Sequence, residues 1–310
     1  MDPVRELTTE RREFDIVGFG ECSIDEVWVV PSLEPGALTG KLRAHKRDRL
    51  GGGQIATAMV ACARLGLRAA FCATIGDDGD ANEVLDGLAG EGVDTAGVHR
   101  FARLATRVAL ILVDERGQRV VLDTGRSASA PAPPMLRERV AQARVVHLDV
   151  TEPAYAMLAA HHAHEVGTLV SLDVDHPAPG VDELLPLADV CITSRGVPEQ
   201  LTGETNLESA LRALAEKTRG LVGCTLEADG AALLHDGHLI LSPAFPVDHM
   251  IDTTACGDTF HAAFLCALVE EQPPRQALRF ANAAAALKCR DLGRRGCPTR
   301  AEVNAFIAAT

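Results

Sequence analysis

Tryptophan and tyrosine occur once each among the 310 residues, and aromatic residues make up only 4% of the chain. So few aromatic side chains argue against the stacking platforms that bind single-stranded nucleic acids. Basic residues are outnumbered by acidic ones, with 30 Lys and Arg against 43 Asp and Glu, so the net charge is −13. This balance opposes nonspecific binding to nucleic acids and anionic membranes. We therefore expect neither as a partner.

Long apolar runs are missing too. No uninterrupted stretch approaches the ~18 residues of a membrane-spanning helix. The opening residues, MDPVRELTTERREFD, carry both signs of charge and lack the apolar segment of a signal peptide. The nine cysteines show no C-x-x-C pair and no zinc-ligand spacing, and their neighbours are apolar. The sequence therefore predicts buried thiols in a protein of the reducing cytoplasm.

The composition is that of a globular chain, with 47% apolar and 24% charged residues. A chain of about 300 residues can hide roughly three quarters of its unfolded surface. We find no repeat and no low-complexity linker, and the stretch APAPP at 130–134 is interpreted as a stiff turn. Residues 1–310 are therefore expected to form a single domain.

Short apolar runs alternate with amphipathic segments along most of the chain. Strands are predicted at 14–18, 24–30, 69–75, 108–113, 120–123, 145–150, 168–173, 190–193, 221–226, 231–234 and 239–241. Helices are predicted at 54–65, 81–90, 135–142, 153–165, 198–202, 207–217, 258–270 and 274–289. Residues 32–50 are expected to be irregular.

This order indicates an α/β fold with a doubly wound, mostly parallel sheet flanked by helices. The segments near 24–46 and 106–123 differ, because they alternate apolar and charged residues. We expect them to form a half-exposed antiparallel flap.

Two nucleotide-binding motifs can be set aside. One segment that follows a strand is Gly18-Phe19-Gly20-Glu21-Cys22-Ser23. Ser23 stands where a dinucleotide-binding motif has its third glycine, and the chain continues as a strand where such a site needs a helix. No segment matches the Walker A pattern. A Rossmann dehydrogenase is therefore a distant alternative.

The strongest signal is IDTTACGDTF at 251–260, a small-residue turn that opens an apolar helix. Such a turn presents unpaired backbone N–H groups at the positive end of the helix dipole, which is an anion site. Asp258 in the first helical turn could accept a proton from an attacking hydroxyl. A plain helix cap is the competing interpretation. A second glycine-led helix begins at GGGQIATA, residues 51–58, and closes with ARLG.

Together these motifs resemble the ribokinase-like (PfkB) family of carbohydrate and nucleoside kinases. DTTACGD resembles its D-T-x-G-A-G-D signature, and the glycine-led helix resembles its N-terminal signature. IGDDG at 75–79, EGVDT at 91–95 and ANAAAA at 281–286 resemble further family segments, in the family's order. The likeness covers about residues 14–305.

The resemblance implies a ribokinase-like sandwich with a small β-sheet lid at about 26–50 and 105–125. It implies that ATP donates its γ-phosphoryl group to a sugar-type hydroxyl, with Asp258 as the catalytic base. The N–H groups of Ala255, Cys256 and Gly257 would form the anion hole. A lid with open strand edges also suggests a homodimer that pairs through the lid.

The resemblance places substrate and nucleotide residues as well. Asp25 would hold substrate hydroxyls, although it could instead be a solvent-facing residue of a lid strand. The expected substrate-binding residues are Asp25, Gly52, Gly53 and Thr57. The expected nucleotide-side residues are Thr225, Glu227, Gly257 and Asn282.

The sequence departs from the family pattern at several positions. Ala255 and Cys256 replace Gly and Ala of the signature, which we expect to be tolerated because neither position should need a positive φ. Thr57 replaces the usual substrate-binding Asn. The stretch at 194–197, SRGV, lacks the N-x-x-E that orders Mg²⁺, and Thr225-Leu226-Glu227 replaces T-x-G. No metal-ligating residue is therefore assigned, although a carboxylate such as Glu227 could assist the phosphates.

The last two departures resemble the ketohexokinase and sulfofructose kinase branches. We therefore expect an ATP- and Mg²⁺-dependent kinase acting on a primary hydroxyl of a ketose or sulfonated ketose. Ribose, 2-keto-3-deoxygluconate and nucleosides stay open as substrates, as does a monovalent cation as a further ligand. A noncatalytic sugar- or nucleotide-sensing protein on this scaffold is the alternative from another functional class.

Overall fold

The computed structural model describes residues 12–36, 40–123 and 130–310. Parts of the predicted lid, residues 37–39 and 124–125, lie outside these ranges. The main sheet has the strand order β14-β13-β12-β11-β10-β9-β1-β4. Its members are β1 (Phe14–Phe19), β4 (Ala69–Phe71), β9 (Ala143–Leu148), β10 (Leu169–Val174), β11 (Val190–Thr193), β12 (Leu221–Thr225), β13 (Ala231–His235) and β14 (His238–Ser242).

The strands from β4 to β12 pair in parallel, and β13 and β14 add an antiparallel edge. The central strand β10 is buried at every residue, as expected for a parallel strand covered on both faces. The predicted mostly parallel α/β sheet is therefore confirmed.

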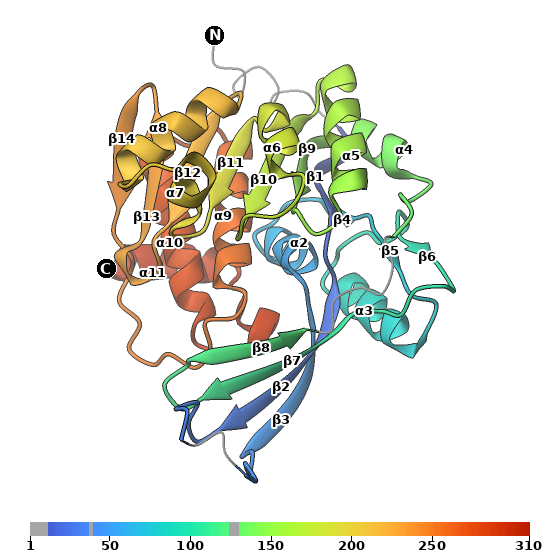
Figure 1. The fold of residues 1–310 in the computed structure, drawn as a ribbon, viewed down its shortest axis with the longest axis vertical. Helices are drawn as coiled ribbons and strands as arrows, with labels where there is room; N and C mark the ends of the chain where they lie inside the picture. Colours follow the sequence, from blue (N-terminus) through green and yellow to red (C-terminus); the bar gives the residue numbers. More distant parts are fainter. Residues whose placement is uncertain (1–11, 37–39, 124–129) are drawn as a thin grey trace.

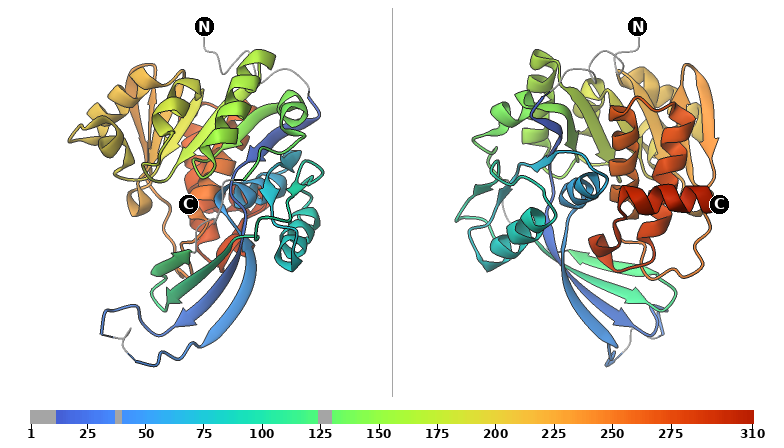
Figure 2. Two further views of the ribbon diagram at one scale, coloured as in Figure 1. Left: turned by 45° about the vertical axis from the view of Figure 1, so that its right-hand side comes forward. Right: turned by 180° about the vertical axis from the view of Figure 1, so that it is seen from behind.

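Helices cover both faces of the sheet (Figures 1 and 2). One apolar core forms with α2 (Gln54–Arg64), α3 (Gly79–Gly90), α9 (Cys256–Val269), α10 (Pro274–Lys288) and α11 (Arg300–Ala309). The other forms with α4 (Leu136–Ala141), α5 (Pro153–Val166), α6 (Val181–Leu184), α7 (Val197–Thr202) and α8 (Leu207–Lys217). Short 3₁₀ turns η1, η2 and η3 lie at Leu185–Leu187, Glu227–Asp229 and Gly293–Gly296. No described helix is long and apolar enough to cross a membrane.

A second sheet projects from one end of this sandwich and forms the lid (Figure 1). Its strand order is β3-β2-β7-β8, with bounds β2 (Ser23–Val30), β3 (Lys46–Gly52), β7 (Val108–Asp114) and β8 (Arg119–Asp123). A small apolar cluster around Val27, Ile111 and Leu292 holds the lid against the body.

The structure corrects three local predictions. Residues 46–50 are strand, because β3 pairs antiparallel with β2. The lid is not a purely antiparallel flap, since its two central strands β2 and β7 run in parallel. Apolar alternation identifies a strand but carries no information about the direction of its partner. The predicted strand at 69–75 is divided, because β5 (Thr74–Ile75) leaves the main sheet to pair with β6 (His99–Arg100).

The connection between β1 and the lid is fixed by one buried carboxylate. Asp149 follows β9 and accepts hydrogen bonds from the backbone N–H groups of Glu21 at 2.7 Å and Thr151 at 2.9 Å. Burial raises the pKa of Asp149 to about 7. Gly20 leaves room for this contact, since a Cβ there would lie 2.4 Å from Asp149 Oδ2. The lid therefore begins at a defined point on the sheet edge.

Candidate active site

A cavity of about 220 Å³ lies where the lid, the carboxyl end of β10 and the N-terminus of α9 meet. This is the end of a parallel sheet at which α/β proteins bind ligands. Of the residues predicted from the sequence, the structure brings six to its wall: Asp25, Gly53, Thr57, Ala255, Gly257 and Asp258. Gly52 lies directly beside them, since a Cβ on Gly52 would lie 2.1 Å from Asp25 Oδ2.

The remaining predicted residues lie outside this cavity. Thr225 ends β12 and its hydroxyl donates to the backbone oxygen of Thr193 at 3.4 Å. Glu227 is exposed, with Oε2 at 3.7 Å from Arg195 Nε. Asn282 is buried on α10, where its amide nitrogen donates to the backbone oxygens of Ser242 at 2.9 Å and Pro243 at 3.2 Å. The Asn282 amide thus ties α10 to the segment that follows β14.

Asp258 occupies the first turn of α9 and opens into the cavity. No donor in the described chain makes a hydrogen bond to its carboxylate. Burial raises the pKa of Asp258 well above the ordinary value. The negative charges of Asp173, Asp175 and Asp25 raise it further, whereas the positive charge of Arg119 lowers it. An unengaged carboxyl group with a raised pKa at a cavity wall is suited to accept a proton.

Backbone N–H groups surround the start of the same helix. Gly257 is exposed to the cavity, and its N–H and that of Ala255 find no acceptor among the described residues. The Cys256 N–H already donates to Thr253 O, at a long 3.3 Å. The predicted anion hole therefore has two open donors and one weakly engaged donor.

Ala255 departs from the expectation for this turn. It adopts φ 67° and ψ 6°, so the position does require the left-handed conformation that the sequence analysis considered unnecessary. For a residue with a Cβ this conformation costs about 1–2 kcal/mol. The cost arises because the left-handed conformation brings Cβ too close to the following carbonyl oxygen. The left-handed residue stands directly before Cys256, where α9 begins.

Cys256 points away from the cavity towards α10. Its Sγ lies 3.2 Å from Sγ of Cys289, and both are free thiols. The hydrogen bond with Cys289 and burial raise the pKa of Cys256. Cys256 is therefore a packing residue of the turn and not a reactive low-pKa thiol.

A fully buried ion pair holds the turn from behind. Asp252 Oδ1 accepts from the Thr254 N–H at 2.8 Å and Oδ2 from the Gly293 N–H at 2.7 Å. The ammonium of Lys288, which has no exposed surface, lies 3.7 Å from Asp252 Oδ2. It donates to the backbone oxygens of Asp252 at 2.9 Å and Asp291 at 3.0 Å. A buried charge is tolerated only with such partners, so this lysine fixes the loop geometry.

Asp25 lies on the lid strand β2, is only 7% exposed, and accepts a hydrogen bond from Ser23 Oγ at 2.7 Å. Burial raises its pKa to about 6, although the Ser23 hydrogen bond and the Arg294 charge oppose this. The alternative of a solvent-facing lid residue is therefore wrong. A buried carboxylate with one oxygen free suits hydroxyl donors of a ligand.

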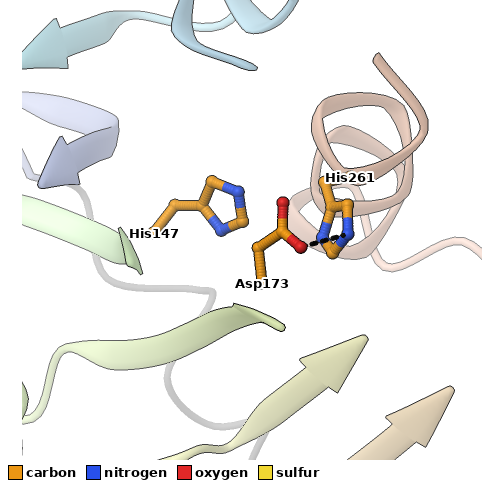
Figure 3. A group of neighbouring side chains, drawn as sticks. All are labelled: His147, Asp173 and His261. Carbon is orange, nitrogen blue, oxygen red and sulfur yellow. Dashed lines mark ion pairs between the residues drawn. The ribbon is translucent and has the colours of Figure 1, made fainter. Parts of the chain in front are cut away.

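Asp173, His261 and His147 form a buried cluster, and the first two line the same cavity as Asp258. His261, one turn along α9, places Nε2 at 3.2 Å from Asp173 Oδ1, and His147 stands beside them (Figure 3). The three ligand atoms lie within 4.8 Å of one another. Burial raises the pKa of Asp173, but the three histidines near it, His261 first, together hold this pKa below its ordinary value. Two imidazoles would suit a transition metal better than Mg²⁺, which prefers oxygen.

Three arginines also line the cavity. Arg107 is neutralised by ion pairs with Glu21 and Asp123. Arg119, on β8, donates to Thr253 Oγ1 at 3.4 Å and makes no other hydrogen bond with the described residues. Arg294, on η3, contributes a nitrogen Nη1 that is buried without a hydrogen-bond partner in the described chain. None of these three arginines belongs to a motif that was predicted from the sequence.

Two further site residues could have been found from sequence. Asp173 lies near the carboxyl end of an apolar strand and Asp175 follows it, at the edge where parallel sheets gather ligand-binding side chains. Arg294 and Lys288 gave weaker signals. Arg294 lies in a polar turn, and Lys288 ends an alanine-rich helix where a cation is ordinary.

Replacing Asp25 by Asn should stabilise the free protein at pH 8. Burial raises the pKa of the Asp25 carboxyl group from 3.8 to about 6. The ionised carboxylate therefore destabilises the fold by about 3 kcal/mol. Asn keeps the Ser23 hydrogen bond without the charge. Because the penalty is complete above the folded pKa, the gain in unfolding free energy should fade as pH falls from 6 to 4. Urea unfolding at pH 8 and pH 4.5 measures this, and a variant less stable than wild type at pH 8 would refute it.

Comparisons with known proteins identify the family of this chain. The family model for pfkB family carbohydrate kinases matches residues 14–300. A ribokinase of Haemophilus influenzae is 32% identical over 93% of this chain and 96% of its own length. An ATP-dependent ribose-1-phosphate kinase of Halopiger xanaduensis is 30% identical over 87% of this chain and 90% of its own length. The structure of an Arabidopsis thaliana ribokinase complexed with ribose and ATP superposes with a TM-score of 0.82, at 26% identity over 95% of this chain and 98% of that one. The chain therefore belongs to the pfkB family of carbohydrate kinases.

Proposed function

We propose that this protein transfers the γ-phosphoryl group of ATP to a primary hydroxyl of a small sugar. One observation carries the proposal: the free carboxylate of Asp258 and the open N–H groups of the α9 turn face the same cavity as Asp25. A proton acceptor, an anion site and a hydroxyl-binding carboxylate together are what phosphoryl transfer to an alcohol requires.

In this mechanism Asp25 accepts hydrogen bonds from sugar hydroxyls and orients the acceptor. Gly52 and Gly53 let the sugar approach the backbone closely, and Thr57 offers a hydroxyl from the first turn of α2. Asp258 takes the proton of the attacking hydroxyl as the new O–P bond forms. The N–H groups of Ala255, Cys256 and Gly257 stabilise negative charge on the transferring group. Arg119 lies on the lid close enough to influence Asp258 and can neutralise the same charge.

The nucleotide would lie beyond the anion hole, along the ends of β12 and α10. Thr225 and Asn282 come from these two elements, and Glu227 follows Thr225 in a 3₁₀ turn. We propose that Thr225 and Glu227 contact the nucleotide directly. Asn282 would shape its site by holding the segment after β14.

The cavity also suits Mg²⁺. The carboxylates of Asp173, Asp175 and Asp258 face it together, and their mutual repulsion contributes to the raised pKa of Asp258. Carboxylates and phosphate oxygens are the ligands that Mg²⁺ prefers. We propose that Asp175, with Asp173 behind it, would hold the ion, a better-placed choice than the exposed Glu227. Bound Mg²⁺ supplies positive charge to the ATP phosphates.

The acceptor is proposed as a ketose or sulfonated ketose, on the basis of the SRGV and TLE sequence departures. Relatives named for ribose, for ribose 1-phosphate and for fructose leave the choice open, including whether the acceptor carries a charge. The nine free cysteines are consistent with action in the cytoplasm.

Asp258→Asn should retain the fold and bind ATP but lower kcat by about 10²–10⁴-fold, the usual contribution of general-base catalysis. ADP release with a panel of sugars and ATP–Mg²⁺ measures this, with Asp248→Asn as a control outside the cavity. Because the pKa of Asp258 is raised in the free protein, kcat/KM should begin to fall on acidification well above pH 4. Near-native kcat in the variant would remove Asp258 from the mechanism. Failure of every sugar with the wild type would favour the noncatalytic sensing protein.

Activity should not depend on an added monovalent cation. The oxygens that could hold one behind the anion hole, from Asp252 and Asp291, already surround the ammonium of Lys288. We expect equal rates, within about twofold, in potassium and tetramethylammonium salts. Lys288→Ala should lose activity and recover part of it with ammonium ions, whereas Lys217→Ala, on the exposed end of α8, should behave as wild type. Stimulation of the wild type by potassium of tenfold or more would contradict this.

A homodimer through the lid is also proposed. The edge strand β8 exposes three consecutive apolar residues, Val120, Val121 and Leu122, of which Leu122 is 53% exposed. An open apolar edge is usually paired or covered. Sedimentation at micromolar concentration should give a dimer, and Leu122→Lys a monomer. Leu158→Lys on α5, 50% exposed, is the matched control. A monomeric, fully active wild type would refute the dimer.

A further inference from the structure

Arg294 has an unexplained environment. Its guanidinium projects from η3 into the acceptor side of the cavity, and its Nη1 is buried with no hydrogen-bond partner in the described chain. No carboxylate of the described residues lies within 4 Å of it. A buried charge normally has a hydrogen-bonded partner, because removing it from water is costly. Arginine cannot avoid the cost by losing its proton.

The surroundings of Arg294 are built around this side chain. A Cβ on Gly51 would lie 2.0 Å from Nη2, and one on Gly87 would lie 2.6 Å from the same atom. The guanidinium therefore sits in a slot between β3 and α3 that any larger residue at these two positions would close. A slot of this kind fixes the orientation of the planar group towards the cavity.

The position of Arg294 relative to Asp25 indicates which kind of ligand the two residues could bind together. Arg294 is near enough to Asp25 to lower its pKa, yet the two make no ion pair. Asp25 can accept from sugar hydroxyls, and the Arg294 nitrogens can only donate. A ligand that satisfies both must carry hydroxyl donors at one end and acceptor oxygens at the other. Phosphate, sulfonate and carboxylate groups offer such oxygens, and a guanidinium binds them with paired hydrogen bonds.

We propose that the acceptor is an anionic sugar, whose phosphate, sulfonate or carboxylate group is bound by Arg294. This inference rests on the proposed kinase function and narrows its substrate class. Arg107 is a poorer candidate for the same role, because Glu21 and Asp123 already neutralise it. The charge of Arg119 also acts on Asp25, but it acts on Asp258 and Cys256 as well, so we assign Arg119 to the transferring phosphoryl group. Arg294 is therefore a specificity-determining residue.

The test compares neutral sugars with anionic partners that keep a free primary hydroxyl. Ribose is paired with ribose 1-phosphate, and fructose with fructose 6-phosphate and its sulfonated analogue; 2-keto-3-deoxygluconate is added as a carboxylate. ADP release should give the best anionic sugar a kcat/KM about 100-fold or more above that of its neutral partner. A neutral sugar as the best substrate would overturn the inference while leaving the kinase function intact.

Variants assign the preference to Arg294. Arg294→Met should lower kcat/KM for the anionic sugar by about 100-fold, mainly through KM, and leave KM for ATP within about twofold. Arg294→Lys should recover part of the loss. Arg295→Gln is the control, because Arg295 lies next in the same turn, is largely exposed and pairs with Asp48. Equal charge preference in Arg294→Met and wild type would overturn the assignment.

A binding measurement separates this inference from the kinase function. Thermal stabilisation by ribose 1-phosphate, fructose 6-phosphate and the corresponding neutral sugars is recorded for wild type and Arg294→Met. If no sugar releases ADP but an anionic sugar stabilises only proteins that retain Arg294, the kinase function fails and the anion site stands. If no anionic sugar binds more tightly than its neutral partner, the anion site fails.

Discussion

The buried pair of Asp252 and Lys288 is the interaction on which the site depends. The two residues join the loop before α9 to the end of α10 and to the turn at Gly293, with no exposed surface on either side chain. Every donor of the anion hole lies within six residues of Asp252. Removing either charge would leave the other buried and uncompensated, at about 3–5 kcal/mol. The geometry of the turn before α9 and the stability of this end of the molecule are therefore set by the same pair.

The cavity in front of this pair collects more negative charge than it can neutralise alone. Asp25, Asp173, Asp175 and Asp258 face it, and His261 compensates only Asp173 at hydrogen-bonding distance. Burial is the main cause of the raised pKa values of Asp25 and Asp258, and the charges of Asp173, Asp175 and Asp25 raise the pKa of Asp258 further. A site that is strained in this way gains stability from a divalent cation and from the arginines of the lid. The binding of a Mg²⁺–nucleotide complex and the ionisation of Asp258 should therefore favour each other.

Much of this could be predicted from the sequence, because the informative residues are local. The turn that opens α9 is a contiguous motif, and buried parallel strands appear as short apolar runs. The prediction failed where distant segments decide the structure. The parallel pairing of β2 with β7 joins segments more than eighty residues apart. Arg294 reaches the site because Gly51 and Gly87, both remote in sequence, leave space for it. No local pattern reports either arrangement.

The left-handed conformation of Ala255 connects the buried ion pair with the N–H groups at the start of α9. A glycine would adopt φ 67° without strain, so an alanine here means that the surrounding contacts impose the conformation. The contacts are identifiable: Asp252 fixes the Thr254 N–H on one side, and the Ala255 carbonyl accepts from the Thr259 N–H and hydroxyl on the other. The residue is held between a buried ion pair and the first turn of a fully packed helix. Strain of about 1–2 kcal/mol is small beside the interactions that enforce it. The turn can therefore keep its N–H groups directed into the cavity before any ligand arrives, which is the preorganisation that stabilisation of a transferring phosphoryl group requires.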